Sequence, residues 1–249
     1  MFRHCGATVL VAAWLAACAS APEENGFPAG DDALTETLRQ TAENAERTYN
    51  FQAAAGHYGR LSERQPDSLE PILGQARNLR YAGAPRDAIR TLRRAMEERG
   101  EQTPLLLELA KAQFASALTA DSRETLSRLS ELTPDDWQVY AMQAMLEDNK
   151  GQYDTAQELY RRALALSPNN PSVVNNYSLS LAQTGELDQA IQLLEPIVYG
   201  EQSTAQARQN LAMLYVLNGD TESAEKLVEG DLPADLARQN LSTFQSLAE

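Results

Sequence analysis

A fixed interval of 34 residues runs through most of the chain and restricts its fold more than any other feature. Glycine occurs at four places that are 34 or 68 residues apart, and alanine fills the vacant place: Gly83, Ala117, Gly151, Gly185 and Gly219. Proline keeps the same interval at another place, at Pro66, Pro134 and Pro168. A repeat of this length is one supersecondary unit that needs neighbours to cover its apolar face. The chain is therefore expected to form a linear array of units.

Counting from Thr35 divides the chain into six contiguous units: 35–68, 69–102, 103–136, 137–170, 171–204 and 205–238. Within each unit, Ala and Leu recur at spacings of three and four, which is typical of amphipathic helices. The eighth and twentieth places are always Ala or Ser, as in Ala144 and Ala156. Small side chains at both places predict that two helices cross closely within each unit. The glycine place lies between them, where a tight turn is expected.

The fourth unit, WQVYAMQAMLEDNKGQYDTAQELYRRALALSPNN, resembles the tetratricopeptide repeat at nearly every defining place. The resemblance implies an all-α fold, a right-handed superhelical solenoid of about six repeats. The pentapeptide ARQNL occurs at Ala207 and again at Ala237, after EGDLPAD interrupts the last unit. We interpret the second copy as part of a C-terminal capping helix over 235–249, because a solenoid must cover its last apolar face.

Two units depart from the pattern. Tyr49 replaces the turn glycine of the first unit, so the conformation of that turn is less well defined by the sequence. Pro196 lies inside the expected second helix of the fifth unit and should end or kink it about a turn early. The segment IVYGEQST that follows is then expected to be a long loop.

The first residues have the form of a secretory signal peptide over 1–17, with Arg3 before an apolar run too short to span a membrane. The run ends in LAAC, which resembles the processing motif of bacterial lipoproteins. This resemblance implies that Cys18 is lipidated and that, with Ala19 next to it, the protein is anchored in the outer membrane. The alternative is an ordinary signal peptide with an incidental cysteine. Residues 18–34, rich in Pro, Gly and charge, are expected to form a flexible tether.

Charge and composition exclude several classes of function. The net charge is −14, so phosphate backbones repel the chain and nucleic-acid binding is not expected. Once the signal peptide and Cys18 are set aside, His57 is the remaining histidine and no thiol is left. This excludes a zinc site of Cys and His and a Cys–His nucleophile, so we expect no metal, no cofactor and no enzymatic activity.

The first helix of each unit is expected to line a concave groove that suits a partner protein's segment. In the first three units this lining is charged: Arg39, Glu43, Arg77, Arg80 and Lys111. In the last three units it is apolar and amide-rich, and these residues are the candidate partner-binding site: Met142, Met145, Asn175, Asn176, Leu179, Gln209, Asn210 and Met213. The amides can bond a partner's backbone, and the methionines offer an adaptable apolar floor.

Packing is the alternative role for some of these side chains. Leu179, Met213 and the nearby Val216 can instead fill the space between neighbouring first helices. Trp137 and Tyr140 stand where the repeat family places packing aromatics, and are interpreted as core. The lysines with which some family members clamp a C-terminal carboxylate are replaced by Asn and Gln, so that activity is not implied.

The C-terminal part of the chain resembles a narrower family. The segment AIQLLEPIVYGEQSTAQARQNLAMLYVLNGDTESAEKLVEGDLPADLARQNLSTFQSL is similar to the TadD lipoproteins of the tight-adherence (Flp) pilus system. Its landmarks are LLEP followed by ARQNLA, and DLP followed by NL. This resemblance implies that the protein assists a secretin, or another pilus-assembly component, at the outer membrane. The alternative is a general envelope scaffold: a type IV pilus pilotin, an outer-membrane protein assembly factor or an adaptor for peptidoglycan enzymes.

Overall fold

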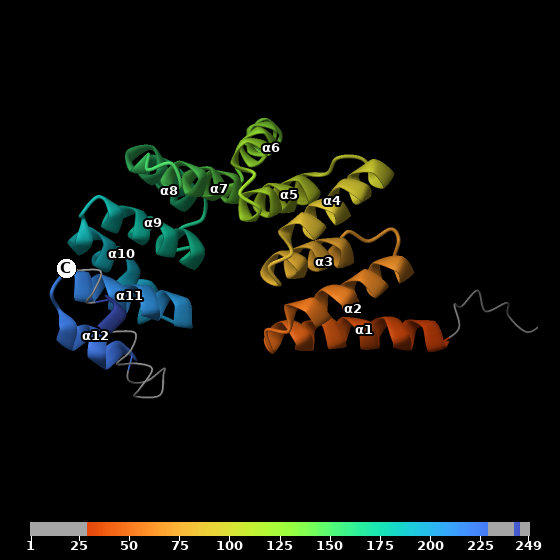
Figure 1. The fold of residues 1–249 in the computed structure, drawn as a ribbon, viewed down its shortest axis with the longest axis horizontal. Coiled ribbons are helices and arrows are strands. Elements are labelled where there is room, and N and C mark those ends of the chain that lie inside the picture. The colour runs from red at the N-terminus through yellow and green to blue at the C-terminus, as the bar shows by residue number, and fades with distance from the viewer. Residues whose placement is uncertain (1–28, 229–241, 245–249) are drawn as a thin grey trace, which may run out of the picture.

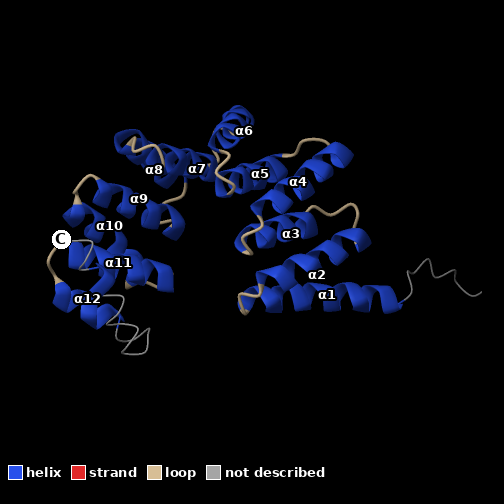
Figure 2. Ribbon diagram, viewed as in Figure 1, coloured by secondary structure: helices blue, strands red, loops and turns tan. Residues whose placement is uncertain are grey.

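The computed structural model describes residues 29–228 and 242–244, and this part of the chain contains α-helices and no β-strand (Figure 2). Consecutive helices form antiparallel pairs that stack into a curved solenoid (Figure 1). The all-α solenoid expected from the sequence is therefore confirmed. The helices are α1 (Ala29–Arg47), α2 (Phe51–Arg64), α3 (Glu70–Tyr81), α4 (Pro85–Arg99), α5 (Thr103–Ala115), α6 (Thr119–Leu132), α7 (Trp137–Asp148), α8 (Tyr153–Leu166), α9 (Pro171–Gln183), α10 (Leu187–Val198), α11 (Ala205–Leu217) and α12 (Thr221–Val228).

The 34-residue interval is reproduced in the helix boundaries. The second helices of the units begin at residues 51, 85, 119, 153, 187 and 221. Local chemistry fixes several first-helix boundaries: the side chains of Asp136, Asn170 and Thr204 each accept a hydrogen bond from a backbone N–H of the first turn of α7, α9 and α11. Each capping side chain satisfies a donor that the helix itself leaves unpaired.

The N-terminal boundary of the array needs a correction. We expected a flexible tether up to residue 34, but α1 already begins at Ala29. Asp32 then lies in its first turn, where the positive end of the helix dipole favours an acidic side chain. The expected signal peptide, Cys18 and the rest of the tether lie outside the described residues.

The small residues at the eighth and twentieth places form the centre of every unit. All of them are completely buried: Ala42, Ala54, Ala76, Ala88, Ala110, Ser122, Ala144, Ala156, Ser178, Ala190, Ala212 and Ala224. The larger residues at the twenty-fourth place, such as Tyr58, Leu126 and Tyr160, are at most 3% exposed and fill the space between helix pairs. The core is thus a series of linked clusters along the solenoid, in which each unit packs against its neighbours.

The turn between the two helices of a unit has the left-handed conformation in all six units. At the four glycines of this place φ lies between 74° and 85°. Ala117 has φ 59° and Tyr49 has φ 57°, so both non-glycine residues adopt the same turn. The replacement of glycine by Tyr49 therefore leaves the turn in place and adds backbone strain instead.

The expectation for Pro196 is partly wrong. Helix α10 continues through Pro196 and ends at Val198, so the loop covers 199–204 and does not start at Ile197. The physical reason is burial: Ile197 and Val198 are 7% and 5% exposed and belong to the C-terminal core cluster. The apolar surface that they remove from water favours the extra helical residues despite the proline.

Most of the expected capping helix over 235–249 lies outside the described residues. Residues 242–244 are helical, and the partly buried Phe244 packs against the core cluster that α9 to α12 share.

The solenoid curves as an arch in Figure 1. Helices α1 to α4 form one limb, α9 to α12 form the other, and α5 to α8 connect the limbs. The middle helices therefore lie where the array changes direction, and the candidate site described next is built on them.

Candidate partner-binding clefts

Two adjoining clefts lie on the first helices in the middle of the array. The larger, here called the wide cleft, has a volume of about 480 Å³ and lies between α3, α5, α7 and α9. The smaller, here called the tyrosine cleft, has a volume of about 360 Å³ and is bounded by α5, α7, α8 and α9. The two share the side chains of Phe114, Met145 and Asn176 as walls. Together they form one continuous hollow surface over the second, third, fourth and fifth units.

Four of the eight predicted site residues line these clefts. Met142, Met145 and Asn176 contribute to the wide cleft, and Leu179 joins Met145 and Asn176 in the tyrosine cleft. Met142 is 7% exposed and also belongs to the core cluster of α5 to α7, so it forms the floor rather than a wall. Leu179 belongs to no core cluster of the described residues.

The other four predicted residues, Asn175, Gln209, Asn210 and Met213, lie outside both clefts. The side-chain amide of Asn210 donates a hydrogen bond of 2.7 Å to Oδ1 of Asn175. The side-chain amide of Asn175 in turn donates one of 3.3 Å to Oδ1 of Asn176. This amide chain joins α11 to α9, so in the free protein it links neighbouring units. Its role toward a partner stays a prediction. The nearby Val216 is 5% exposed and lies in the C-terminal core, where it packs as the alternative interpretation proposed.

Several aromatic residues of the clefts are not among the predicted site residues. Phe114 lines both, Tyr81 and Trp137 line the wide cleft, and Tyr153 lines the tyrosine cleft. Trp137 was interpreted as core only; it packs against the cluster of α7 and α8 and also faces the wide cleft. Phe114 occupies the twelfth place of its unit, the place that Arg80 of the predicted groove lining holds in the second unit, so that signal was present in the repeat frame.

The basic residues of the charged lining in the first three units pair with glutamates of the first helices. Arg77 contacts Glu46 at 2.9 Å, and Arg80 contacts Glu108 at 3.0 Å. Lys111 approaches the other oxygen of Glu108 at 3.8 Å. Burial lowers the pKa of Lys111, and the carboxylate of Glu108 only partly offsets this. These pairs connect α1 to α3 and α3 to α5, so they join neighbouring units on the side of the first helices.

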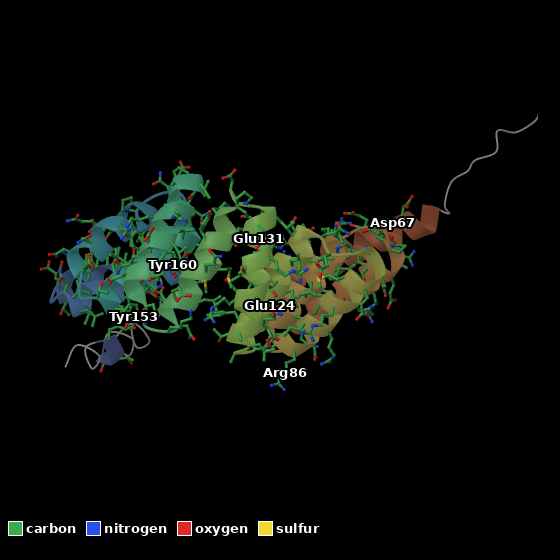
Figure 3. The ribbon with its side chains drawn as sticks, turned by 90° about the horizontal axis from the view of Figure 1, so that it is seen from above. Asp67, Arg86, Glu124, Glu131, Tyr153 and Tyr160 are labelled. Atoms are coloured by element: carbon green, nitrogen blue, oxygen red, sulfur yellow. The ribbon has the colours of Figure 1, made fainter. Side chains whose placement is uncertain are left out.

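The tyrosine cleft contains a half-buried carboxylate. The Tyr160 hydroxyl donates to Asp148 Oδ2 at 2.8 Å, and the Ser180 hydroxyl donates to Asp148 Oδ1 at 2.6 Å. All three residues line the cleft, and Figure 3 shows Tyr160 and Tyr153 together in the C-terminal half of the molecule. Burial raises the pKa of Asp148, while the two hydroxyl donors act in the opposite direction and do not cancel the effect. Asp148 also stands at the twelfth place of its unit, as Phe114 does, but it was not among the predicted site residues.

The described residues contain neither a group of three or more metal-ligating side chains placed to hold an ion, nor a helix long and apolar enough to cross a bilayer. The clefts offer apolar surface, amides, the carboxylate of Asp148 and, in the wide cleft, the cationic side chains of Arg80 and Lys111.

Comparison with known proteins identifies the repeats. Residues 79–146 and 150–208, just over half of the chain, match the tetratricopeptide repeat family. The chain belongs to this family. Tetratricopeptide repeats form surfaces for protein–protein interaction, and the fold itself is a scaffold without chemistry of its own.

Two curated relatives match parts of this array. A TPR repeat-containing thioredoxin of Arabidopsis thaliana is 38% identical over 98 residues, which are 39% of this chain and 14% of that protein. The uncharacterized protein y4yS of Sinorhizobium fredii is 32% identical over 100 residues, 40% of this chain and 55% of that protein. The chain thus spans a small part of the first relative and about half of the second. The two cysteines of this chain, Cys5 and Cys18, do not have the Cys-x-x-Cys spacing of a thioredoxin redox site.

Among solved structures, the one from the functional characterization of Pseudomonas aeruginosa pilF is similar over 86% of this chain and 99% of its own, with a TM-score of 0.58. The sequence identity is 18%, so this similarity shows a shared fold.

Proposed function

We propose that this protein is a lipid-anchored, periplasm-facing scaffold of the outer membrane that binds a segment of a partner protein in the two clefts. In this proposal the partner is the secretin, or another component, of the Tad (Flp) pilus, and binding assists its assembly or localisation. The observation that carries the proposal is the continuous hollow formed by the wide and tyrosine clefts, with Phe114 and Met145 as its shared apolar walls and Asn176 as its shared amide.

The shape and chemistry of this hollow favour an extended or helical peptide segment. Apolar walls provide burial, and a small number of placed polar groups fix the orientation of what binds. The methionines can adjust to the shape of the bound side chains. The pilus component of the proposal is supported by the resemblance of the C-terminal segment to TadD lipoproteins, and the membrane anchor by the LAAC motif that ends at Cys18.

Deletion of the gene tests the pilus role. We expect loss of secretin multimers from outer-membrane fractions and loss of surface Flp pili, both restored by the wild-type gene. Unchanged secretin multimers and pili would reject this role and favour the general envelope scaffold. Co-purification of the secretin with the wild-type protein, and its loss with Asn176→Ala, would link the role to the clefts.

The anchor has an independent test. Cys18→Ser should release the protein from the membrane fraction, because lipid attachment requires the thiol. Cys5→Ser, inside the expected signal peptide, is the matched control and should leave membrane association unchanged. Retention of the Cys18→Ser protein in the membrane would contradict lipidation at this residue.

A further inference from the structure

The first and fourth units each contain a carboxylate that accepts hydrogen bonds from a tyrosine and from a second side chain, and the first arrangement also includes a cation. In the first unit, the Tyr58 hydroxyl donates to Glu46 at 3.4 Å, and the Asn78 amide donates to the same carboxylate at 2.5 Å. Three repeat lengths later, Tyr160 and Ser180 donate to Asp148 in the same way. The pairs occupy equivalent places, with separations of 12 and 32 residues in both units.

The surroundings of the two carboxylates differ in whether a cation is present. Glu46 also forms an ion pair with Arg77 at 2.9 Å. The residue equivalent to Arg77 in the later pair of units is Leu179. Within the described part of the chain, Asp148 makes no ion pair, and the nearby Lys150 pairs with Glu147 instead.

The missing cation changes the electrostatics of the two carboxylates. Burial acts to raise the pKa of Glu46, but the hydrogen bonds from Asn78 and Arg77 outweigh it and the pKa is lowered overall. The pKa of Asp148 is raised, because burial dominates there. A half-buried carboxylate without a cation is an unfavourable arrangement that a bound positive charge would relieve.

Asp148 is also accessible to such a charge. It lines the tyrosine cleft together with Phe114, Met145 and Leu179, and it is the one Asp, Glu, Lys or Arg among the residues that line this cleft. The wide cleft, by contrast, is lined by the cationic side chains of Arg80 and Lys111, which both contact Glu108. The overall charge of −14 favours a positively charged partner as well.

We propose that the partner segment inserts a lysine or arginine side chain into the tyrosine cleft, where its cation pairs with Asp148 and its aliphatic part packs against Phe114, Met145 and Leu179. The bound cation takes the place that Arg77 occupies beside Glu46. This inference rests on the proposed function, since it requires that a partner segment enters the clefts.

A display library of random short peptides, selected against the full-length protein, tests the inference. The enriched peptides should carry Lys or Arg at a fixed position next to apolar residues. Asp148→Asn should weaken their binding at least about tenfold, since truncating one partner of a desolvated charge pair has effects of this size or larger. Asp154→Asn, an equal change of charge at an exposed position of α8, is the control and should leave affinity unchanged.

A second variant uses the equivalence of the two units. Leu179→Arg places a guanidinium at the position equivalent to Arg77, so it should pair with Asp148 within the protein. Peptide affinity should then fall about as much as it does with Asp148→Asn. The stability of the Leu179→Arg protein should be equal to or greater than that of the wild type, which separates blocked binding from misfolding. Acetylation of the peptide lysine should cause the same loss with the wild type and no further loss with Asp148→Asn, as a double-mutant cycle requires.

The outcomes distinguish the inference from the function on which it rests. Enriched peptides without a fixed basic residue, or equal binding to wild type and Asp148→Asn, would overturn the inference and leave segment binding standing. If no peptide binds above background, segment capture fails, and the inference fails with it.

Discussion

At the scale of single residues, one backbone conformation recurs through the array. The turn between the helices of each unit requires φ near +60° to +85°, which glycine adopts without strain and other residues do not. Tyr49 and Ala117 keep this conformation because the helix pairs on either side determine where the chain must reverse. The repeat frame thus imposes the turn even where the local residue disfavours it.

Replacement of Ala117 by glycine should therefore stabilise the protein. Glycine removes the left-handed strain from the folded state, and it also gives the unfolded chain more conformational entropy. The first effect on free energy is the larger, so we expect an increase of about 0.5–1 kcal/mol in the free energy of unfolding. Gly151→Ala, at the equivalent turn, should cause a loss of about 1 kcal/mol. Urea unfolding of the three proteins measures both, and a less stable Ala117→Gly protein would contradict the strain at this position.

Asp148 and Glu46 should respond to pH with opposite signs. A raised folded-state pKa means that the ionised Asp148 disfavours folding, and this penalty appears as the pH rises through that pKa. Asp148→Asn should therefore unfold at higher urea than the wild type near pH 7, since the Tyr160 hydroxyl can accept from the new amide. The advantage should disappear near about pH 3, where the carboxyl group is protonated in both states.

The pKa of Glu46 is lowered, so its ionised form favours folding at neutral pH and this contribution is lost as the pH falls through the folded-state pKa. Glu46→Gln should be less stable than the wild type at pH 7, and the difference should shrink in acid. Urea unfolding of both variants across the pH range measures these trends. If both variants were more stable than the wild type at neutral pH, or both less stable, the two carboxylates would not differ in their electrostatic contribution to folding.

At the scale of helices, sequence signals are reliable where they agree with burial and misleading where they do not. Proline normally ends a helix, yet α10 continues past Pro196 because Ile197 and Val198 are buried in the C-terminal core. The helix then closes tightly: a Cβ atom on Gly200 would lie 2.6 Å from the carbonyl oxygen of Pro196. A different glycine, Gly56 in α2, has no atom within 4 Å of such a Cβ.

These two glycines should respond oppositely to the same substitution. Gly56→Ala should raise the free energy of unfolding by about 0.5–1 kcal/mol, because alanine is the better helix former and its methyl group meets open space. Gly200→Ala should lower it by about 1–2 kcal/mol, since the backbone at the end of α10 must move. Thermal or urea unfolding of each variant checks the pair. A neutral Gly200→Ala would indicate that the end of α10 is not tightly closed.

At the scale of the whole molecule, the array has no single core. Its buried clusters are shared by adjacent units, so a local change is felt by the neighbouring helices and little beyond them. The arch in Figure 1 separates α1 to α4 from α9 to α12. The clefts are lined by helices of the connecting part together with α3 from one limb and α9 from the other. A partner segment bound there would contact units on both sides of the bend.

This linear organisation predicts how a terminal mutation spreads. Phe244→Ser removes a side chain packed on the C-terminal cluster, and should cost about 1 kcal/mol of local stability, since the ring is partly buried. Hydrogen exchange should accelerate in α11 and α12, while α1 to α4 keep their protection. Leu132→Ser, at a position 60% exposed in α6, is the control and should leave α11 and α12 unaffected. Uniform acceleration throughout the chain would show a single cooperative unit.

The sequence predicted the fold well and the site only in part. The interval of 34 residues and the small residues at two fixed places determine the helix pairs, since both express local geometry that each unit repeats. Met142, Met145, Asn176 and Leu179, chosen from the same frame, line the clefts, and their role toward a partner stays a prediction. Phe114 and Asp148 stood at an expected groove-facing place and were still missed, because their neighbours across units were unknown.

By itself, then, the sequence determined the repeat, its helix pairs, the small buried positions and the place of the tight turn within each unit. The tertiary structure decided that Asn210 bonds Asn175 across two helices, and that Asp148 meets Tyr160 and Ser180 without a cation. The physical reason is distance along the chain. The repeated residues specify the structure inside one unit. Contacts between units depend on how successive helix pairs are rotated relative to one another, and packing throughout the array sets that rotation.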